Sequence, residues 1–267
     1  MQNVIACPRV NVSNFFYKRK LNVFNLTAHL SLNKCAYNAM WSEHQAGRGA
    51  NEITSALVKI LEKVLEDYPL LESITLWSDS CIPQNSAMVT ALKHFMQNHP
   101  IIKTIEQKFS EPGHSQIQEV DCVHSHIEKA LNLSEIFSPV SLLRVINKER
   151  PKNMKVIQLQ PDYFYNFQTA SQCFRFANVP FTKVKHIKLE AGKFSFVSFK
   201  ASFANDFNKV SIVVNNTRQK TKPTMPKICK LSKSTELTKD KIKDLRSMTK
   251  YMPVDHRTYY EVMLNKS

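Results

Sequence analysis

The sequence predicts an α/β fold: a mixed sheet flanked by helices, followed by a basic α+β extension. Over residues 1–133, short apolar runs with a strand-like pattern alternate with segments whose apolar residues recur every third or fourth position. Beyond residue 139 this regularity weakens and the positive charge rises. We therefore expect a sheet-and-helix domain over 1–150, a small β-rich extension over 151–216, and a basic linker with a terminal helix over 217–267.

The first domain is predicted to begin with a hairpin, because polar and apolar residues alternate on both sides of a turn at Asn33–Lys34. Three helices with one apolar face each then alternate with two further strands. The elements expected in order are strands 15–30 and 35–43, helix 49–67, a buried strand within 73–81, helix 87–98, strand 101–109 and helix 120–133. This order predicts one mixed sheet with helices packed on its faces.

The extension is predicted to be a small antiparallel unit, because its β-rich runs are short and lie around a glycine, Gly192. A basic, proline-punctuated linker with poor packing prospects follows these runs. The elements expected are helix 142–147, strand 154–160, β-rich runs in 185–203 and 211–215, the linker 217–235 and helix 238–251, which Pro253 stops.

The net charge of +15 lies wholly in the second half of the chain. Residues 1–132 carry 12 Lys and Arg against 12 Asp and Glu, whereas residues 133–267 carry 25 against 10. A basic segment joined to a neutral one indicates a polyanionic partner, nucleic acid first, because neutralising phosphates releases counterions. We expect phosphate contacts from Lys183, Lys185 and Lys188, with DNA preferred to RNA. A solubilising surface or tail is the alternative interpretation.

Several features bear on location. No apolar run reaches the roughly 18 residues that a membrane span needs. The first residues lack the basic start and apolar core of a secretory signal, and the six cysteines include no C-x-x-C pair. We therefore expect an intracellular protein with reduced thiols and no membrane partner, nuclear rather than cytoplasmic.

Carboxylates at two places could bind a metal. Asp79 ends a predicted strand, where α/β sheets hold their ligands. Asp121, His124 and Glu128 are spaced by three and four residues, so a helix puts them on one face. If that face turns toward Asp79, the carboxylates could hold Mg²⁺ or Mn²⁺ for phosphodiester cleavage, with His114 or His124 contacting phosphate.

Other interpretations of these residues are open. Asp121, His124 and Glu128 have the spacing that is also typical of an ordinary solvent-exposed helix face. An aspartate such as Asp79 often only caps a helix or closes a turn. A set that contains histidine could also bind Zn²⁺ rather than Mg²⁺.

Short motifs spread over the first 150 residues carry a resemblance to one family. They are Tyr17–Leu21 with Asn25–Leu26, Trp41–Glu43, Arg48–Gly49 with Asn51–Ile53, Trp77–Cys81 with Gln84–Asn85, Lys108–Phe109 with Pro112–Ser115, and Asp121 with His124–Ser125 and Ile127–Glu128. Together they resemble transposon-derived proteins of invertebrates whose domain is similar to RNase H-like transposases and integrases. A weaker likeness lies at Tyr251–Val254 and Tyr259–Tyr260.

The resemblance implies an RNase H-like fold: a three-strand meander, a helix, and then alternating strands and helices. It also implies catalysis of phosphodiester cleavage or strand transfer by two metal ions, held by acids on the first strand, the fourth strand and a later helix. Asp79 matches the fourth-strand position. Either Asp121 or Glu128 would be the later acid.

The family's first-strand aspartate lies just before a segment like Met1–Pro8, so we expect this chain to begin immediately after it, with only a stub of that strand. Because losing a metal-binding carboxylate abolishes turnover, the expected function is a nuclease- or transposase-type domain that acts on or binds nucleic acid and is inactive as this truncated chain. The alternatives are a catalytically dead nucleic-acid-binding module and a protein-interaction module.

Overall fold

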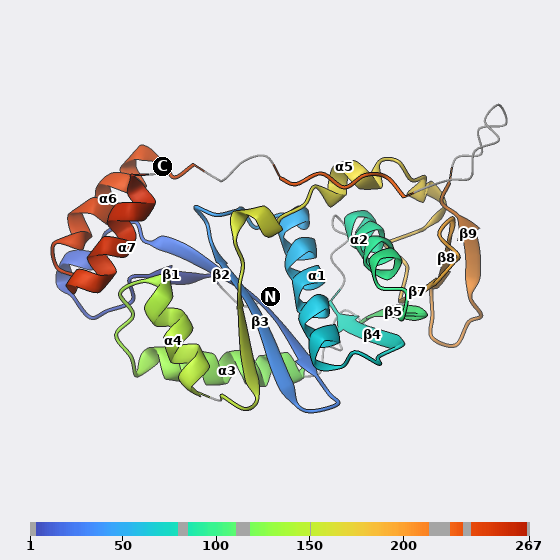
Figure 1. The fold of residues 1–267 in the computed structure, drawn as a ribbon, viewed down its shortest axis with the longest axis horizontal. Helices are drawn as coiled ribbons and strands as arrows, with labels where there is room; N and C mark the ends of the chain where they lie inside the picture. Colours follow the sequence, from blue (N-terminus) through green and yellow to red (C-terminus); the bar gives the residue numbers. More distant parts are fainter. Residues whose placement is uncertain are drawn as a thin grey trace. The chain divides into compact units, whose positions relative to one another are not determined.

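A computed structural model describes residues 4–79, 85–110, 118–149, 151–213, 225–231 and 236–265 (Figure 1). The chain divides into two compact units: unit 1 comprises residues 1–48, 117–163 and 232–267, and unit 2 comprises residues 49–116 and 164–231. The described residues form seven α-helices and two mixed sheets, one in each unit. The α/β class is therefore confirmed, but the strands belong to two sheets instead of the single sheet expected. Each unit combines segments from separate parts of the chain, whereas the prediction divided the chain into three consecutive domains with boundaries at 150 and 216.

The sheet of unit 1 has the strand order β1-β2-β3-β6. Its strands are β1 (Ile5–Cys7), β2 (Leu21–Leu30), β3 (Cys35–Ser42) and β6 (Met154–Gln158). The first three are antiparallel, and β6 runs parallel to β3. The predicted hairpin is confirmed: Lys34 has a φ of 55°, and the Asn33 side chain accepts a hydrogen bond from the Cys35 backbone at 2.9 Å. Strand β2 starts later than expected because Ser13–Phe15 forms a 3-10 turn that buries Phe15.

Two helix pairs complete unit 1. Helices α3 (Glu119–Asn132) and α4 (Pro139–Glu149) pack on the sheet, α3 against β2 and α4 against β6 (Figure 1). Helices α6 (Lys239–Thr249) and α7 (Val254–Leu264) pack together and enclose Phe15. Helix α7 was not predicted. Pro253 does end the preceding helical segment, but it also stands at the N-cap of α7, a position that tolerates proline.

The sheet of unit 2 has the strand order β4-β5-β7-β8-β9. Its strands are β4 (Ser73–Ser78), β5 (Thr104–Phe109), β7 (His186–Glu190), β8 (Phe196–Lys200) and β9 (Asn208–Ser211). Strands β4 and β5 are parallel, and the other neighbours are antiparallel. The β-rich runs that were expected to form a separate extension therefore continue the sheet that β4 and β5 begin.

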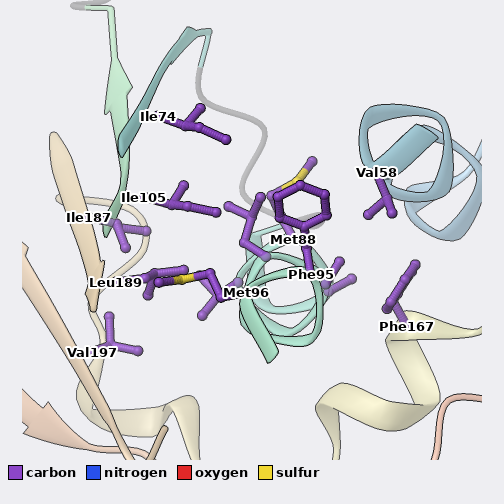
Figure 2. Packing of buried hydrophobic residues seen from close by; sticks show 14 of the residues in the cluster. Val58, Ile74, Met88, Phe95, Met96, Ile105, Phe167, Ile187, Leu189 and Val197 are labelled. Atoms are coloured by element: carbon purple, nitrogen blue, oxygen red, sulfur yellow. The ribbon is translucent and has the colours of Figure 1, made fainter. Parts of the chain in front are cut away.

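Helix α2 (Asn85–Asn98) packs on one face of this sheet, and α1 (Ala50–Asp67) and the short α5 (Phe167–Ser171) pack against α2. Figure 2 shows the strand residues of this inner face pointing at α2, with Val58 of α1 and Phe167 of α5 on the other side of that helix. The labelled strand residues are Ile74, Ile105, Ile187, Leu189 and Val197. Because strand side chains alternate between the two faces, every second residue of these strands lies on the opposite, outer face.

Strand β4 was expected to be buried, and this expectation was wrong. It lies at the edge of the sheet and only its inner face is covered: Ile74 is 8 % exposed, whereas Trp77 is 60 % exposed.

Among the helices of the described residues, none is long and apolar enough to cross a membrane.

Candidate nucleic-acid interface

The outer face of the unit 2 sheet carries lysines from four adjacent strands. The strand register places Trp77 of β4 beside Lys108 of β5, then His186 of β7, then Lys200 of β8. We call this surface the basic–aromatic face and define it by Trp77, Lys108, Lys188, Phe196, Lys200, Phe203, Phe207 and Lys209. Phe203 and Phe207 come from the connection between β8 and β9.

Each lysine of the face lies over an aromatic ring. The ammonium nitrogen of Lys108 is 5.5 Å from the centre of the Trp77 ring. Those of Lys188 and Lys200 are 5.8 and 4.5 Å from the centre of Phe207. At the far edge of the sheet, Lys209 lies 4.5 Å from the centre of Phe196. These distances are within the roughly 6 Å at which a cation is attracted to a ring face, so the rings help to hold the charges in place.

The rings of the face remain open to solvent. Trp77 is 60 % exposed, Phe203 43 %, Phe196 40 % and Phe207 36 %. Large aromatic side chains usually bury most of their surface, and exposed apolar groups gathered in one place mark interaction sites. The face therefore offers a partner flat apolar surfaces and positive charges together.

A buried histidine lies under the middle of the face. His186 is 7 % exposed and packs against Phe207, with ring centres 4.9 Å apart. Its Nε2 is 3.0 Å from a carboxylate oxygen of Glu106, and the Lys108 ammonium is 3.7 Å from the same oxygen. Burial lowers the pKa of His186 below its usual value, although Glu106 opposes the shift. His186 is thus neutral at pH 7, and the Glu106 carboxylate is engaged within the face.

A buried lysine fixes one edge of the face. Lys93 of α2 is 5 % exposed, and its ammonium group donates to the backbone carbonyls of Phe196 at 2.7 Å and Lys193 at 3.3 Å. Burial lowers its pKa to about 8. The side chain ties the turn before β8 to the helix, which positions the Phe196 ring.

Of the three lysines predicted to contact nucleic acid, one lies on the face. Lys188 is one of its members. Lys183 is exposed and Lys185 is half-buried, and both lie in the connection that leads into β7. His114 lies outside the described residues.

The predicted metal ligands lie in different units. Asp79 follows β4 directly in unit 2 and is exposed. Asp121, His124 and Glu128 lie on α3 in unit 1. Their convergence on one site stays a prediction. Within the described ranges, no group of three or more His, Cys, Asp or Glu side chains is arranged to hold a metal ion.

On α3 each of the three predicted residues has a local partner. Asp121 accepts a hydrogen bond from the Gln118 backbone at 2.8 Å, which caps the helix. Glu128 forms a bidentate ion pair with Arg9, at 2.6 and 3.3 Å. The Nε2 of His124 lies 3.0 Å from the Thr27 hydroxyl on β2, and burial lowers the pKa of this histidine. These contacts are those of a structural helix face.

Comparison with known protein families identifies the family to which the chain belongs. Residues 20–206 match a domain of unknown function, DUF7869. The chain belongs to the DUF7869 family. No curated protein and no solved structure matches it. The DUF7869 match spans strands β2 to β8, with parts of both sheets, and it ends just before Phe207 and Lys209 of the basic–aromatic face.

Sequence reasoning found Lys188 but missed the other members of the face in this DUF7869 chain. A signal for them was present. Trp77 and Lys108 occupy paired positions in two successive strands that are joined by one helix, and Phe196 alternates with the buried Val197. The pairing of β5 with β7, which brings Lys108 beside the later lysines, has no local signature.

Proposed function

We propose that this DUF7869 domain binds nucleic acid through the basic–aromatic face. The observation that carries the proposal is the arrangement of four lysines over exposed aromatic rings on one sheet face. Ammonium groups neutralise phosphates and release counterions, and aromatic rings provide surfaces on which bases stack. The rings and lysines of the face thus match the bases and phosphates that alternate along a nucleic acid.

The composition around the face favours nucleic acid over a protein partner. Residues 164–231, which supply three of its five strands, carry 12 Lys and Arg against 2 Asp and Glu. The cores of protein–protein interfaces are depleted in lysine, whereas nucleic-acid interfaces are strongly positive. A face built around lysine therefore fits a polyphosphate better than another protein.

The test is the affinity for a labelled oligonucleotide, measured by fluorescence anisotropy. The variant Lys188→Gln/Lys200→Gln/Lys209→Gln removes three charges from the face, and we expect it to bind at least about tenfold more weakly. The control Lys59→Gln/Lys63→Gln/Lys103→Gln removes three charges elsewhere in unit 2, from lysines that pair with Glu62, Glu66 and Glu72. Equal losses in the two triple variants, or no binding by the unaltered chain, would overturn the proposal.

An RNase H-like, transposon-derived ancestry is part of the proposal. It is supported by the order of the elements, a meander of β1, β2 and β3 followed by α1, β4, α2, β5 and α3. One feature departs from the expectation: the described meander and the parallel β4–β5 pair belong to separate sheets.

A metal-dependent nuclease is the second candidate function, and the place of Asp79 favours it. This exposed carboxylate follows Trp77 by two residues, the spacing at which strand side chains share a face. Nucleic acid on the basic–aromatic face would thus run toward the Asp79 carboxylate, a candidate metal ligand. Titration calorimetry with Mn²⁺ on the unaltered chain and on Asp79→Ala, Asp121→Ala and Glu128→Gln variants tests this candidate. Binding that Asp79→Ala abolishes would support it, and no binding by the unaltered chain would remove it.

A further inference from the structure

We infer that the basic–aromatic face takes a single strand rather than a duplex, an inference that rests on the proposed function. Either DNA or RNA supplies the required chemistry, a chain of unstacked bases joined by phosphates. Three properties of the face carry the inference: the exposure of its rings, their spacing among the lysines, and its width.

The exposed rings can stack only on unpaired bases. In a duplex each base is already stacked on its neighbours, so a flat ring lying on a sheet can touch only sugars and phosphates. In a single strand the base faces are free, and stacking on an aromatic side chain is worth about 1–3 kcal/mol per base. Trp77, at 60 % exposure, offers the largest such surface on the face.

Rings and charges repeat across the strands of the sheet. Trp77 with Lys108 lies on β4 and β5, Phe207 with Lys188 and Lys200 lies over β7 and β8, and Phe196 with Lys209 lies on β8 and β9. A polymer that presents a base and then a phosphate at each step meets the same sequence of partners when it crosses the strands. The alternation therefore matches a single strand that runs across the sheet.

The width of the sheet works against a duplex. Five strands at about 4.8 Å spacing span roughly 19 Å from β4 to β9. The major and minor grooves of B-DNA are about 12 and 6 Å wide and admit a helix or a two-stranded ribbon. A face of this width enters neither groove, so a duplex could meet only the lysines and would leave the rings without a role.

The sequence provides a direct probe of stacking. The chain has two tryptophans, of which Trp41 is 1 % exposed and Trp77 is 60 % exposed. Quenching of tryptophan emission by a bound oligonucleotide therefore reports on Trp77. Binding is measured by anisotropy with single-stranded DNA, single-stranded RNA and duplex DNA of about 12 nucleotides, within the range of known single-strand sites.

We expect at least one single strand to bind about tenfold or more tightly than the duplex and to quench tryptophan emission. The Trp77→Ala and Phe207→Ala variants should each lose about 5-fold to 150-fold in single-strand affinity and less than about twofold in duplex affinity. Trp77→Phe, which keeps a ring, should lose less than Trp77→Ala. Tyr17→Ala is the control, because Tyr17 is 93 % exposed in unit 1, and circular dichroism melting checks that all variants fold.

The outcomes separate the inference from the proposal beneath it. Equal binding of duplex and single strand without quenching would overturn the single-strand inference and keep nucleic-acid binding. Loss of affinity in Trp77→Ala equal to that in Tyr17→Ala would also overturn it. If no oligonucleotide binds, both the inference and the proposed function fail, and the face is left for a protein partner.

Discussion

At the scale of single residues, we expect His44 to make unit 1 sensitive to acid. Burial lowers the pKa of its imidazole to about 4, and within the described residues its Nδ1 is buried without a hydrogen-bond partner. The folded chain therefore binds the proton less readily than the unfolded chain, whose histidine titrates near 6.5. Stability from this residue is present above pH 6.5 and is lost as the pH falls toward 4, by up to about 3 kcal/mol.

The measurement is urea unfolding at pH 7 and pH 4.5. A Trp77→Phe background leaves the buried Trp41 as the reporter of unit 1. In His44→Phe the loss of stability between these pH values should be smaller than in the parent. His126→Gln, on α3 of the same unit, is the control and should keep the parent's loss. Identical acid sensitivity in all three proteins would show that His44 is not responsible.

At the scale of elements, Glu43 joins the end of β3 to β2 and to α6. Its carboxylate accepts hydrogen bonds from the Asn22 backbone at 2.8 Å, from the Asn22 side chain at 3.0 Å and from the Lys241 ammonium at 2.6 Å. The side chains of Glu43 and Lys241 are each 16 % exposed. Removing the carboxylate leaves Lys241 half-buried without its charge partner, which is far more costly than breaking a surface pair.

We expect Glu43→Gln to lower the free energy of unfolding by about 2–3 kcal/mol, measured by urea denaturation followed by circular dichroism, which reports on both units. Glu66→Gln breaks the exposed pair with Lys63 on α1 and should cost less than about 0.5 kcal/mol. A cost for Glu43→Gln as small as that for Glu66→Gln would contradict the role assigned to Glu43.

The elements also show what the sequence could predict. The β2–β3 hairpin and α1 were found because a turn signal or a helical period lies within their own residues. The assignment of strands to sheets was not found, since the pairing of Lys108 with His186 joins positions 78 residues apart and depends on the tertiary fold. For the same reason the basic–aromatic face was foreseen only at Lys188, although each of its strands was recognised in part.

At the scale of the whole molecule, the excess positive charge is divided almost evenly between the two folded units, although in the sequence it lies in the second half of the chain. The second half holds all of the excess charge in sequence, but the two units share it almost equally: unit 2 carries 17 Lys and Arg against 10 Asp and Glu, and unit 1 carries 20 against 12. Net charge alone therefore does not locate a binding site. What distinguishes the basic–aromatic face is that its lysines lie together among exposed rings.

The salt dependence of binding gives the number of phosphates that lysines neutralise in the complex. For single strands the logarithm of the affinity falls with the logarithm of salt concentration with a slope of about −0.7 per neutralised phosphate. Four lysines on the face, Lys108, Lys188, Lys200 and Lys209, predict a slope near about −3, or a loss of about 50-fold between 50 and 200 mM salt. The triple glutamine variant of the face keeps only Lys108 and should show a slope near about −0.7, while the control triple variant should keep the parent's slope. A parent slope steeper than about −6, unchanged in the variant, would mean that basic residues outside the face hold the strand, and it would move the interface elsewhere on the chain.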